Sequence, residues 1–187
     1  MQYRLDIEVD KNSEQYKWAM TDKNSHILLG HVGTHIDVYN GSNIPLSYKK
    51  VDGVVFDVRG KNIITLEDID TTKIKEKTFV AFYTSRIEKI GYTNKEYFVN
   101  HEILDRKLVE YLISKKVAYI AIDAPGIDIG KNHELVDRLC ESNGVYVIEN
   151  VCNLKCLLKR NFYVIVEFEM LDFMTGVKCH LTANVNN

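Results

Sequence analysis

The sequence lacks most of the features that mark specialised classes of protein. It has only two prolines and four cysteines among 187 residues, and no run rich in glycine or serine. Nothing in it therefore marks a linker, a repeat or a low-complexity segment, and we expect one domain spanning residues 1–187. The cysteines are too few and too late in the chain for a disulfide framework, so we expect reduced thiols.

Basic and acidic residues are nearly balanced in this chain, which argues against proteins that bind nucleic acids or membranes. With 24 basic and 26 acidic residues, not strongly segregated, the formal net charge is -2. This balance gives no basic footprint for nucleic acid or for an anionic membrane. No apolar stretch approaches the roughly 18 residues of a membrane span, and the first ten residues lack the apolar core of a signal peptide. We expect a cytoplasmic protein that acts on a small molecule.

Strand-like segments are more numerous than helical ones in the hydrophobic pattern of this chain. Hydrophobic residues make up 45% of it, enough for a sizeable core. Alternating or continuous apolar runs of β-forming residues predict eight strands. They fall at about 2–9, 27–38, 51–58, 78–84, 117–123, 144–149, 161–170 and 177–185.

Two segments show helical periodicity instead. One spans about 101–115 with Asn100 as the expected N-cap, and the other spans about 131–143 with Gly144 placed to end it. In the second helix we expect four residues to face inward: Leu135, Val136, Leu139 and Cys140. Each helix runs into a buried-looking strand, whereas the first half has consecutive strands. We predict an α/β fold with a mixed sheet or a partly closed barrel and helices packed outside.

The segment 31–37 (HVGTHID) carries the strongest functional pattern. In an extended chain His31, Gly33, His35 and Asp37 project from one face, because successive side chains alternate. A helix would also align His31 with His35, but Gly33 and the β-branched residues of this segment argue against one. At roughly 3.3 Å per residue, His35 and Asp37 are close enough to share an ion. His31 needs a bend to reach it, which Gly33 permits.

Imidazole nitrogens and a carboxylate oxygen suit zinc or manganese, and such an ion can activate water for hydrolysis. A single histidine is usually an ordinary surface or core residue, but two histidines and an acid on one strand face favour a metal site. Cys152 and Cys156 form a second candidate pair for metal, although no further pair follows at zinc-finger spacing, and ordinary packing is the simpler explanation.

Beyond this motif, the chain resembles the cyclase family of metal-dependent hydrolases, which includes bacterial kynurenine formamidase and isatin hydrolase. The segment 31–37 is similar to the His-x-Gly-Thr-His-x-Asp signature of that family. Three later stretches resemble family segments in the same order, so that the likeness covers roughly residues 25–170. They are VVFDVRG at 54–60, AIDAPGID at 121–128 and VIENVCNL at 147–154.

The resemblance implies a swivelling β/β/α-like fold and a metal centre of one or two divalent ions. It implies that His31, His35 and Asp37 hold a first ion and that Asp37 bridges to a second, bound by His133 and Glu149. Taken alone, His133 would be a solvated helix residue and Glu149 a surface acid at the end of a strand.

One departure from the family bears on catalysis. The family motif continues Asp-x-Pro-x-His, and its last histidine is the proposed proton shuttle. Here Asp37 is followed by Val38, Tyr39, Asn40 and Gly41. Tyr39, two residues past Asp37 on the same strand face, is a weak candidate for the catalytic acid, and an aromatic at the mouth of a pocket is the simpler explanation. Three other histidines carry no motif and are expected at the surface, although one could reach the site, from this subunit or a neighbouring one: His26, His101 and His180.

Three functions remain open. The first is a divalent-metal hydrolase of an amide, lactam or cyclic ester, arylformamidase-like, with metal-bound hydroxide as the nucleophile. The second is a metal-binding but catalytically degenerate relative that serves as a ligand-binding or partner subunit. The third is an interaction domain without metal in which His31 and His35 are incidental. We also expect a homo-oligomer, a dimer or higher, because aromatic residues in the long segment 84–100 offer apolar surface to a second copy.

Overall fold

The chain folds around a closed β-barrel. The computed structural model describes residues 1–7, 9–21, 29–170 and 174–186. Seven strands pair in the order β10-β2-β8-β7-β5-β3-β9, and β9 pairs with β10 to close the ring. The short strand β1 (Gln2–Arg4) pairs antiparallel with the last part of β10, at Thr182–Asn184. The seven barrel strands are β2 (His35–Asp37), β3 (Lys50–Asp57), β5 (Phe79–Tyr83), β7 (Tyr119–Ile122), β8 (Tyr146–Glu149), β9 (Phe162–Phe168) and β10 (Gly176–Val185).

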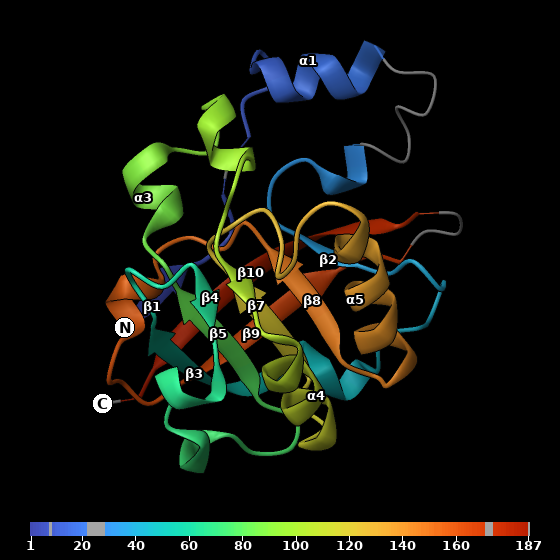
Figure 1. Cartoon of the computed structure of the whole chain (residues 1–187). Coiled ribbons are helices and arrows are strands. Elements are labelled where there is room, and N and C mark those ends of the chain that lie inside the picture. The colour runs from blue at the N-terminus through green and yellow to red at the C-terminus, as the bar shows by residue number, and fades with distance from the viewer. Residues whose placement is uncertain (8, 22–28, 171–173, 187) are drawn as a thin grey trace.

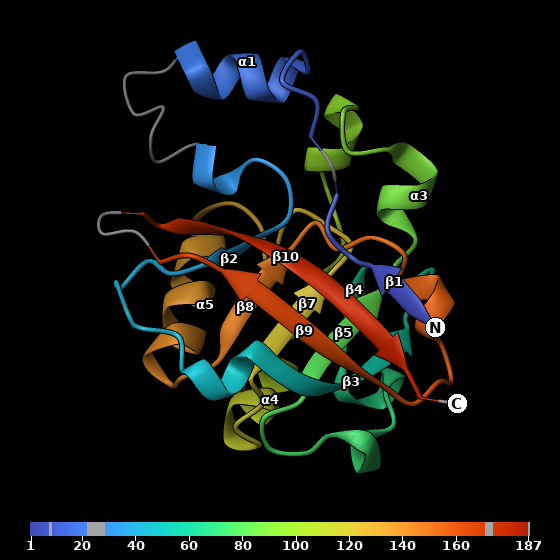
Figure 2. The ribbon, with the colours of Figure 1, turned by 180° about the vertical axis from the view of Figure 1, so that it is seen from behind.

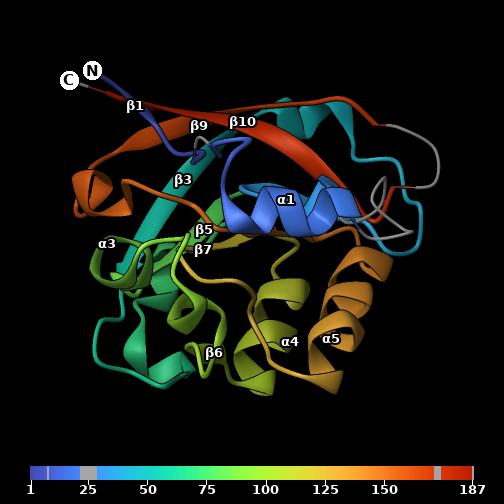
Figure 3. The same cartoon turned by 90° about the horizontal axis from the view of Figure 1, so that it is seen from above.

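The barrel is mixed, because its two halves are connected differently. Strands β3, β5, β7 and β8 are parallel neighbours, whereas β2, β9 and β10 pair antiparallel. Parallel strands need crossover connections. Helix α4 (Arg106–Ser114) lies in the crossover from β5 to β7, and α5 (Lys131–Ser142) in that from β7 to β8. Both helices cover the parallel side of the barrel (Figures 1 and 3), and Figure 2 shows β9 and β10 on the opposite side.

The alternation of side chains along the strands separates two apolar cores. In β7, Tyr119 and Ala121 belong to a cluster with residues of all seven barrel strands, which fills the barrel interior. Ile120 and Ile122 belong to a second cluster with residues of α4 and α5. A strand buried on both faces explains why this segment reads as a continuous apolar run. The fold class predicted from the sequence, α/β with a mixed sheet or barrel and helices outside, is confirmed.

The two predicted helices are present, with one boundary corrected. Helix α5 matches its predicted range closely, and Gly144, with φ of 74°, follows its end. Helix α4 begins at Arg106 rather than near 101, because Asp105 is the N-cap and accepts a hydrogen bond from the Lys107 amide. The preceding residues form the short strand β6 (Ile103–Leu104), which pairs with β4 (Ile63–Ile64).

Three further details differ from the sequence prediction. The strand predicted over 27–38 is only His35–Asp37, and Leu29–His31 form a 3₁₀ turn, η1, while residues 27 and 28 lie outside the described residues. Leu135, predicted to face inward, is 62% exposed. Helix α1 (Glu14–Thr21) was not predicted and lies apart from the barrel in Figure 1.

No helix among the described residues is both long and apolar enough to span a membrane. The four cysteines are all free thiols, as expected.

Candidate metal centre

The candidate site lies between the barrel wall and α5. His35 in β2 is the direct cross-strand partner of Glu149 in β8. Ile36 and Val38 point into the barrel interior, so His35 and Asp37, which alternate with them, point outward. Glu149 shares its strand face with Val147, which packs in the cluster of α4 and α5. The pleat therefore aims the two carboxylates and the imidazole toward the helix layer.

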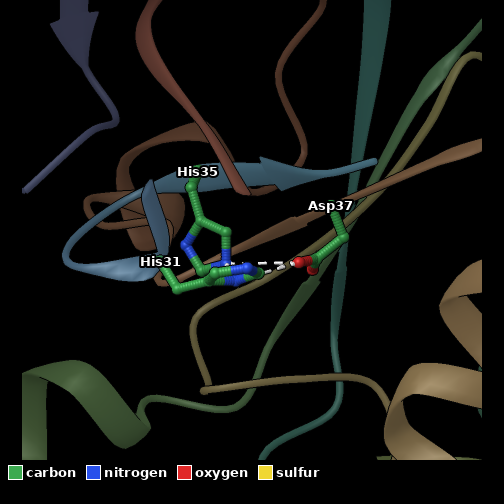
Figure 4. A group of neighbouring side chains, drawn as sticks. All are labelled: His31, His35 and Asp37. Carbon is green, nitrogen blue, oxygen red and sulfur yellow. Dashed lines mark hydrogen bonds and ion pairs between the residues drawn. The ribbon is translucent and has the colours of Figure 1, made fainter. Parts of the chain in front are cut away.

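His31 reaches the same point through a turn at Gly33. Gly33 has φ of 86°, a conformation that favours glycine, and a Cβ there would lie 2.7 Å from Val9 Cγ2. The turn brings His31 Nδ1 to 3.1 Å from His35 Nε2 and 3.3 Å from Asp37 Oδ1. Figure 4 shows both imidazoles turned toward the carboxylate of Asp37, which also lies 3.4 Å from His35 Nε2. The bend predicted at Gly33 is confirmed.

His133 enters the site from the first turn of α5. Its Nε2 lies 3.1 Å from Glu149 Oε1 and 3.3 Å from Asp137 Oδ2. The ring packs on Gly126, where a Cβ would come within 2.6 Å of it. The structure thus brings all five sequence-predicted ligands together: His31, His35, Asp37, His133 and Glu149.

In each histidine of the cluster, the ring nitrogen that points away from the carboxylates contacts an oxygen atom that holds the ring in place. His35 Nδ1 donates to the Gly33 carbonyl at 2.9 Å, and His133 Nδ1 lies 3.2 Å from the Asp128 carbonyl. His31 Nε2 lies 2.9 Å from the hydroxyl of Thr175. Since a carbonyl can only accept, the outward nitrogens of His35 and His133 carry the proton in the neutral ring, which leaves the inward nitrogens with lone pairs. This is how metal-binding histidines are oriented in proteins.

The carboxylates of the cluster face imidazole nitrogens and no other hydrogen-bond donor among the described residues. In the part of the chain that the structure describes, no group meets the hydrogen-bond geometry with either oxygen of Asp37, either oxygen of Asp137 or Oε1 of Glu149, all of which are buried. A buried carboxylate costs several kcal/mol unless a cation or donors compensate it. Two groups of side chains offer ligand atoms that lie within 4.8 Å of one another, namely His31, His35 and Asp37, and Asp37, His133, Asp137 and Glu149. The chemistry of this donor set fits divalent metal.

The electrostatics of the metal-free cluster follow from burial and close charges. Burial disfavours charge on His35, but the carboxylates of Asp37 and Glu149 outweigh it and raise its pKa to about 9. Burial acts in the same way on His133, and Glu149 and Asp137 raise its pKa to about 10. Burial would raise the pKa of Asp37, but the adjacent imidazoles hold it below its usual range. The histidines are thus the counter-charges of this site without metal.

A family model described as "Putative cyclase" matches residues 3–129. The chain belongs to the cyclase family. Among curated proteins no match is found. The fold is that of several solved structures, each below 25% sequence identity, and the similarity to them shows the fold alone.

One of these structures is described as a potential metal-dependent hydrolase with cyclase activity. It matches this cyclase-family chain with a TM-score of 0.77 at 20% identity, and the match covers 98% of this chain and 96% of that one. A predicted metal-dependent hydrolase from Bacillus stearothermophilus matches with a TM-score of 0.75 at 19% identity, covering 98% and 97%. Isatin hydrolase A from Ralstonia solanacearum matches with a TM-score of 0.70 at 17% identity, covering 82% and 72%.

The cluster of this cyclase-family chain includes one residue that the sequence pattern did not predict, Asp137. Asp137 is only 3% exposed, and it lies one helical turn after His133 on α5. Its position between Val136 and Cys140, on the inward side of the helix, was the available signal. An acid on an amphipathic helix is usually solvated, so the pattern alone did not separate it from Glu134 on the exposed side.

The remaining histidines differ in their relation to the site. His101 was expected at the surface but is only 9% exposed, which corrects that prediction. Burial lowers its pKa, and among the charges that act on it are those of Glu149 and His133. His180 is exposed, as expected, and pairs with Asp6 at 3.1 Å. His26 lies outside the described residues.

Tyr39 lies beside the cluster, in the segment that follows Asp37. Its ring stacks on His31 with centroids 5.7 Å apart, and the guanidinium carbon of Arg138 lies 5.4 Å from the centre of the ring. Burial and then the charges of Asp37 and Glu149 raise its pKa far above the usual value. This environment makes the phenol a poor acid.

An open hollow of about 450 Å³ adjoins the cluster at His133. Its wall carries two imidazoles, those of His101 and His133. The apolar part of the wall consists of Phe98, Val99, Pro125 and Ile129. The hollow can therefore hold an apolar group with a polar function directed at the imidazoles.

Proposed function

We propose that this protein is a divalent-metal-dependent hydrolase of an amide, a lactam or a cyclic ester. The observation that carries the proposal is the convergence of three inward-facing imidazole nitrogens on buried carboxylates. The ligands are His31, His35, Asp37, His133 and Glu149, and the ion is zinc or manganese, because both accept mixed nitrogen and oxygen ligands.

When bound, a divalent ion lowers the pKa of a water ligand and polarises a carbonyl oxygen, which is the chemistry that hydrolysis of these bonds needs. The residues of this chain contribute orientation. The Gly33 and Asp128 carbonyls fix the rings of His35 and His133, and the packing of His133 on Gly126 leaves its ring little freedom. Such preorganisation keeps the ligand geometry from having to form during the reaction.

The hollow beside His133 supports a substrate with a compact apolar or aromatic part, such as an aryl formamide or a ring-fused lactam. Phe98, Val99 and Ile129 would contact that part, while its carbonyl faces the cluster. An arylformamidase-like activity is the specific form of the proposal.

His101 is the residue that we propose to exchange a proton with the substrate, in place of the histidine that the family motif carries after Asp37. It lines the hollow together with His133. Its Nδ1 lies 2.9 Å from the Glu102 carbonyl, so Nδ1 carries the proton in the neutral ring and Nε2 has a lone pair. Its lowered pKa keeps it neutral at pH 7, so His101 would first accept a proton from the attacking water and would then donate that proton to the leaving amine.

A second function is favoured by one specific observation. The segment that follows Asp37 carries no histidine, and its Tyr39 is a poor acid. If no other group transfers the proton, the protein binds metal and a ligand without turnover and serves as a binding or partner subunit. Both functions require a bound divalent ion, but only the first includes turnover of a substrate.

The test combines metal analysis with a substrate panel. Protein purified without chelators should contain zinc or manganese, and it should hydrolyse at least one member of a panel of aryl formamides, lactams and cyclic esters. Removing the metal should abolish turnover, and returning it should restore turnover. Metal without hydrolysis of any member would favour the binding function, and protein that takes up neither ion would overturn both.

We also propose that the chain forms a homo-oligomer. Tyr97 is buried within the chain, and the Tyr92 hydroxyl accepts a hydrogen bond from the Gly33 amide, so these two aromatics serve their own subunit. Phe98 and Val99 remain exposed at the rim of the hollow, where a second copy would cover them. Light scattering should give a multiple of 21.6 kDa at micromolar concentration, and a monomer would reject the proposal.

A further inference from the structure

Asp137 has no structural explanation in the metal-free fold. Its side chain is buried, and neither oxygen accepts a hydrogen bond. Among the described residues its one ion-pair partner is His133, whose Nε2 lies 3.3 Å from Oδ2. Placing a carboxylate there with Asp37 and Glu149 close by costs free energy that an apolar residue would not.

The geometry of α5 aims Asp137 at the same point as His133. Residues four apart on a helix lie on one face, and His133 and Asp137 are such a pair. Both offer ligand atoms within 4.8 Å of those of Asp37 and Glu149. The space between α5 and β8 is therefore bordered by three carboxylates and one imidazole.

The two halves of the cluster differ in chemistry. The half formed by η1 and β2 offers two imidazoles and Asp37, and the half formed by α5 and β8 offers His133, Asp137 and Glu149, with Asp37 common to both. Oxygen-rich sites favour ions such as manganese and magnesium, whereas imidazole-rich sites suit zinc. Without Asp137 the second half would have only three ligands, one of them shared.

We propose that Asp137 is a ligand of a second divalent ion, held between α5 and β8, and that it biases this position toward an oxygen-preferring ion such as Mn²⁺. The inference rests on the proposed metal centre but goes beyond its five ligands. Two divalent cations would then compensate the three buried carboxylates, a role that protonated histidines have in the metal-free protein.

The test uses Asp137→Asn, which keeps the size of the side chain and removes its charge. Metal-stripped protein is titrated with Mn²⁺ alone and then with Zn²⁺ alone, and bound metal per chain is measured after equilibrium dialysis. Electron paramagnetic resonance of the Mn²⁺-loaded protein reports whether two ions are coupled. Glu134→Gln is the matched control, because Glu134 lies on the same helix and is exposed, paired with Arg138.

We expect the unaltered protein and Glu134→Gln to bind two Mn²⁺ with a coupled spectrum. Asp137→Asn should bind one Mn²⁺ tightly and the second at least tenfold more weakly, with the coupling lost and with a smaller change for Zn²⁺. The thermal midpoint of metal-free Asp137→Asn should equal or exceed that of the unaltered protein, because Asn keeps the size of the side chain and removes an acid that lies close to Asp37 and Glu149. This measurement separates loss of binding from loss of folding.

Two Mn²⁺ bound to Asp137→Asn with unchanged affinity would overturn the inference and leave the proposed function standing. A single Mn²⁺ in the unaltered protein would overturn it in the same way. An unaltered protein that binds neither ion would overturn the proposed function as well.

Discussion

His133 on α5 and Glu149 at the end of β8 meet with Nε2 and Oε1 3.1 Å apart. The contact joins the helix layer to the barrel wall at the point where His35 pairs with Glu149 across the β2–β8 ladder. In the metal-free protein this junction holds three carboxylates close together and depends on protonated imidazoles for balance. A divalent cation would replace those protons, so metal and proton compete for one site.

Substituting Asp37 is the most direct test of the shared position. Asp37 belongs to both groups of potential ligands, so Asp37→Ala should abolish metal binding and the rise in thermal midpoint that metal gives the unaltered protein. Asp52→Ala is the control, since Asp52 is an exposed acid on β3. Metal content measured in purified protein and melting with and without added ion give the answer. Unchanged metal content in Asp37→Ala would contradict the ligand assignment.

The pKa values predict how stability depends on pH. The pKa values of His35 and His133 are raised to about 9 and about 10, above the ordinary value of about 6.5. Each histidine therefore stabilises the metal-free fold fully below about pH 6.5, and that stabilisation is lost as pH rises through the raised pKa. Metal binding requires both rings to be neutral, so rising pH strengthens it.

We therefore expect the thermal midpoint of metal-free protein to fall as pH rises from 6.5 toward 9, and the increase given by Mn²⁺ to widen over the same range. Calorimetric titration in two buffers of different ionisation enthalpy should detect proton release on metal binding at pH 7. A metal-dependent increase that is equal at pH 6.5 and pH 9 would show that these histidines do not exchange protons for metal.

Much of this site could be predicted from sequence, for reasons that differ between residues. The placement of His35 and Asp37 follows from strand alternation, which is local. His31 reaches the site only through a bend in the chain, and Gly33 indicated where that bend could lie. His133 and Glu149 carry no local signal, and only the order of family-like segments singled them out, because their proximity depends on how α5 packs on β8.

Neither local sequence patterns nor the order of family-like segments singled out Asp137 and His101, because tertiary contacts decide whether these residues are buried. The loop before His101 is held by Arg86, whose guanidinium donates to the carbonyls of Glu96, Tyr97 and Val99. No short-range pattern reports that an arginine of α3 (Arg86–Ile90) organises residues ten or more positions later. The predicted start of helix α4 near residue 101 was wrong for the same reason, because this loop and the Asp105 cap take up the first residues of the predicted range.

Glu141 fixes the loop that follows the metal motif, which gives a prediction about stability. It is buried at the end of α5, and its two oxygens accept hydrogen bonds from the Asn40 amide at 2.6 Å and the Ser42 amide at 2.9 Å. Hydrogen bonds to charged groups are each worth about 1.5 to 3 kcal/mol.

Glu141→Ala should therefore lower the free energy of unfolding by about 2 to 3 kcal/mol in urea titrations, allowing for water that reaches the freed amides. Glu134→Ala on the same helix is exposed and should change it by less than about 0.5 kcal/mol. Equal effects of the two substitutions would show that the loop does not depend on Glu141.

Kinetic measurements on variants of His101 and Tyr39 can identify the proton donor for the leaving group. His101→Gln should lower kcat by about 10²-fold or more, because a general acid or base commonly contributes about 10² to 10⁴. Tyr39→Phe should lower it by less than about threefold, since the raised pKa of the phenol makes it a poor donor. Both variants should keep the metal content of the unaltered protein, and His180→Gln, at an exposed site, is the control.

A series of aryl formamides with leaving amines of increasing basicity sharpens this comparison. Poor leaving groups need protonation most, so the rate of His101→Gln should fall more steeply with amine basicity than that of the unaltered protein. The slope for Tyr39→Phe should match the unaltered slope. If Tyr39→Phe instead steepens the slope and His101→Gln does not, the phenol is the donor after all, and the stacking of Tyr39 on His31 has to be reinterpreted as the means of bringing its hydroxyl to the substrate.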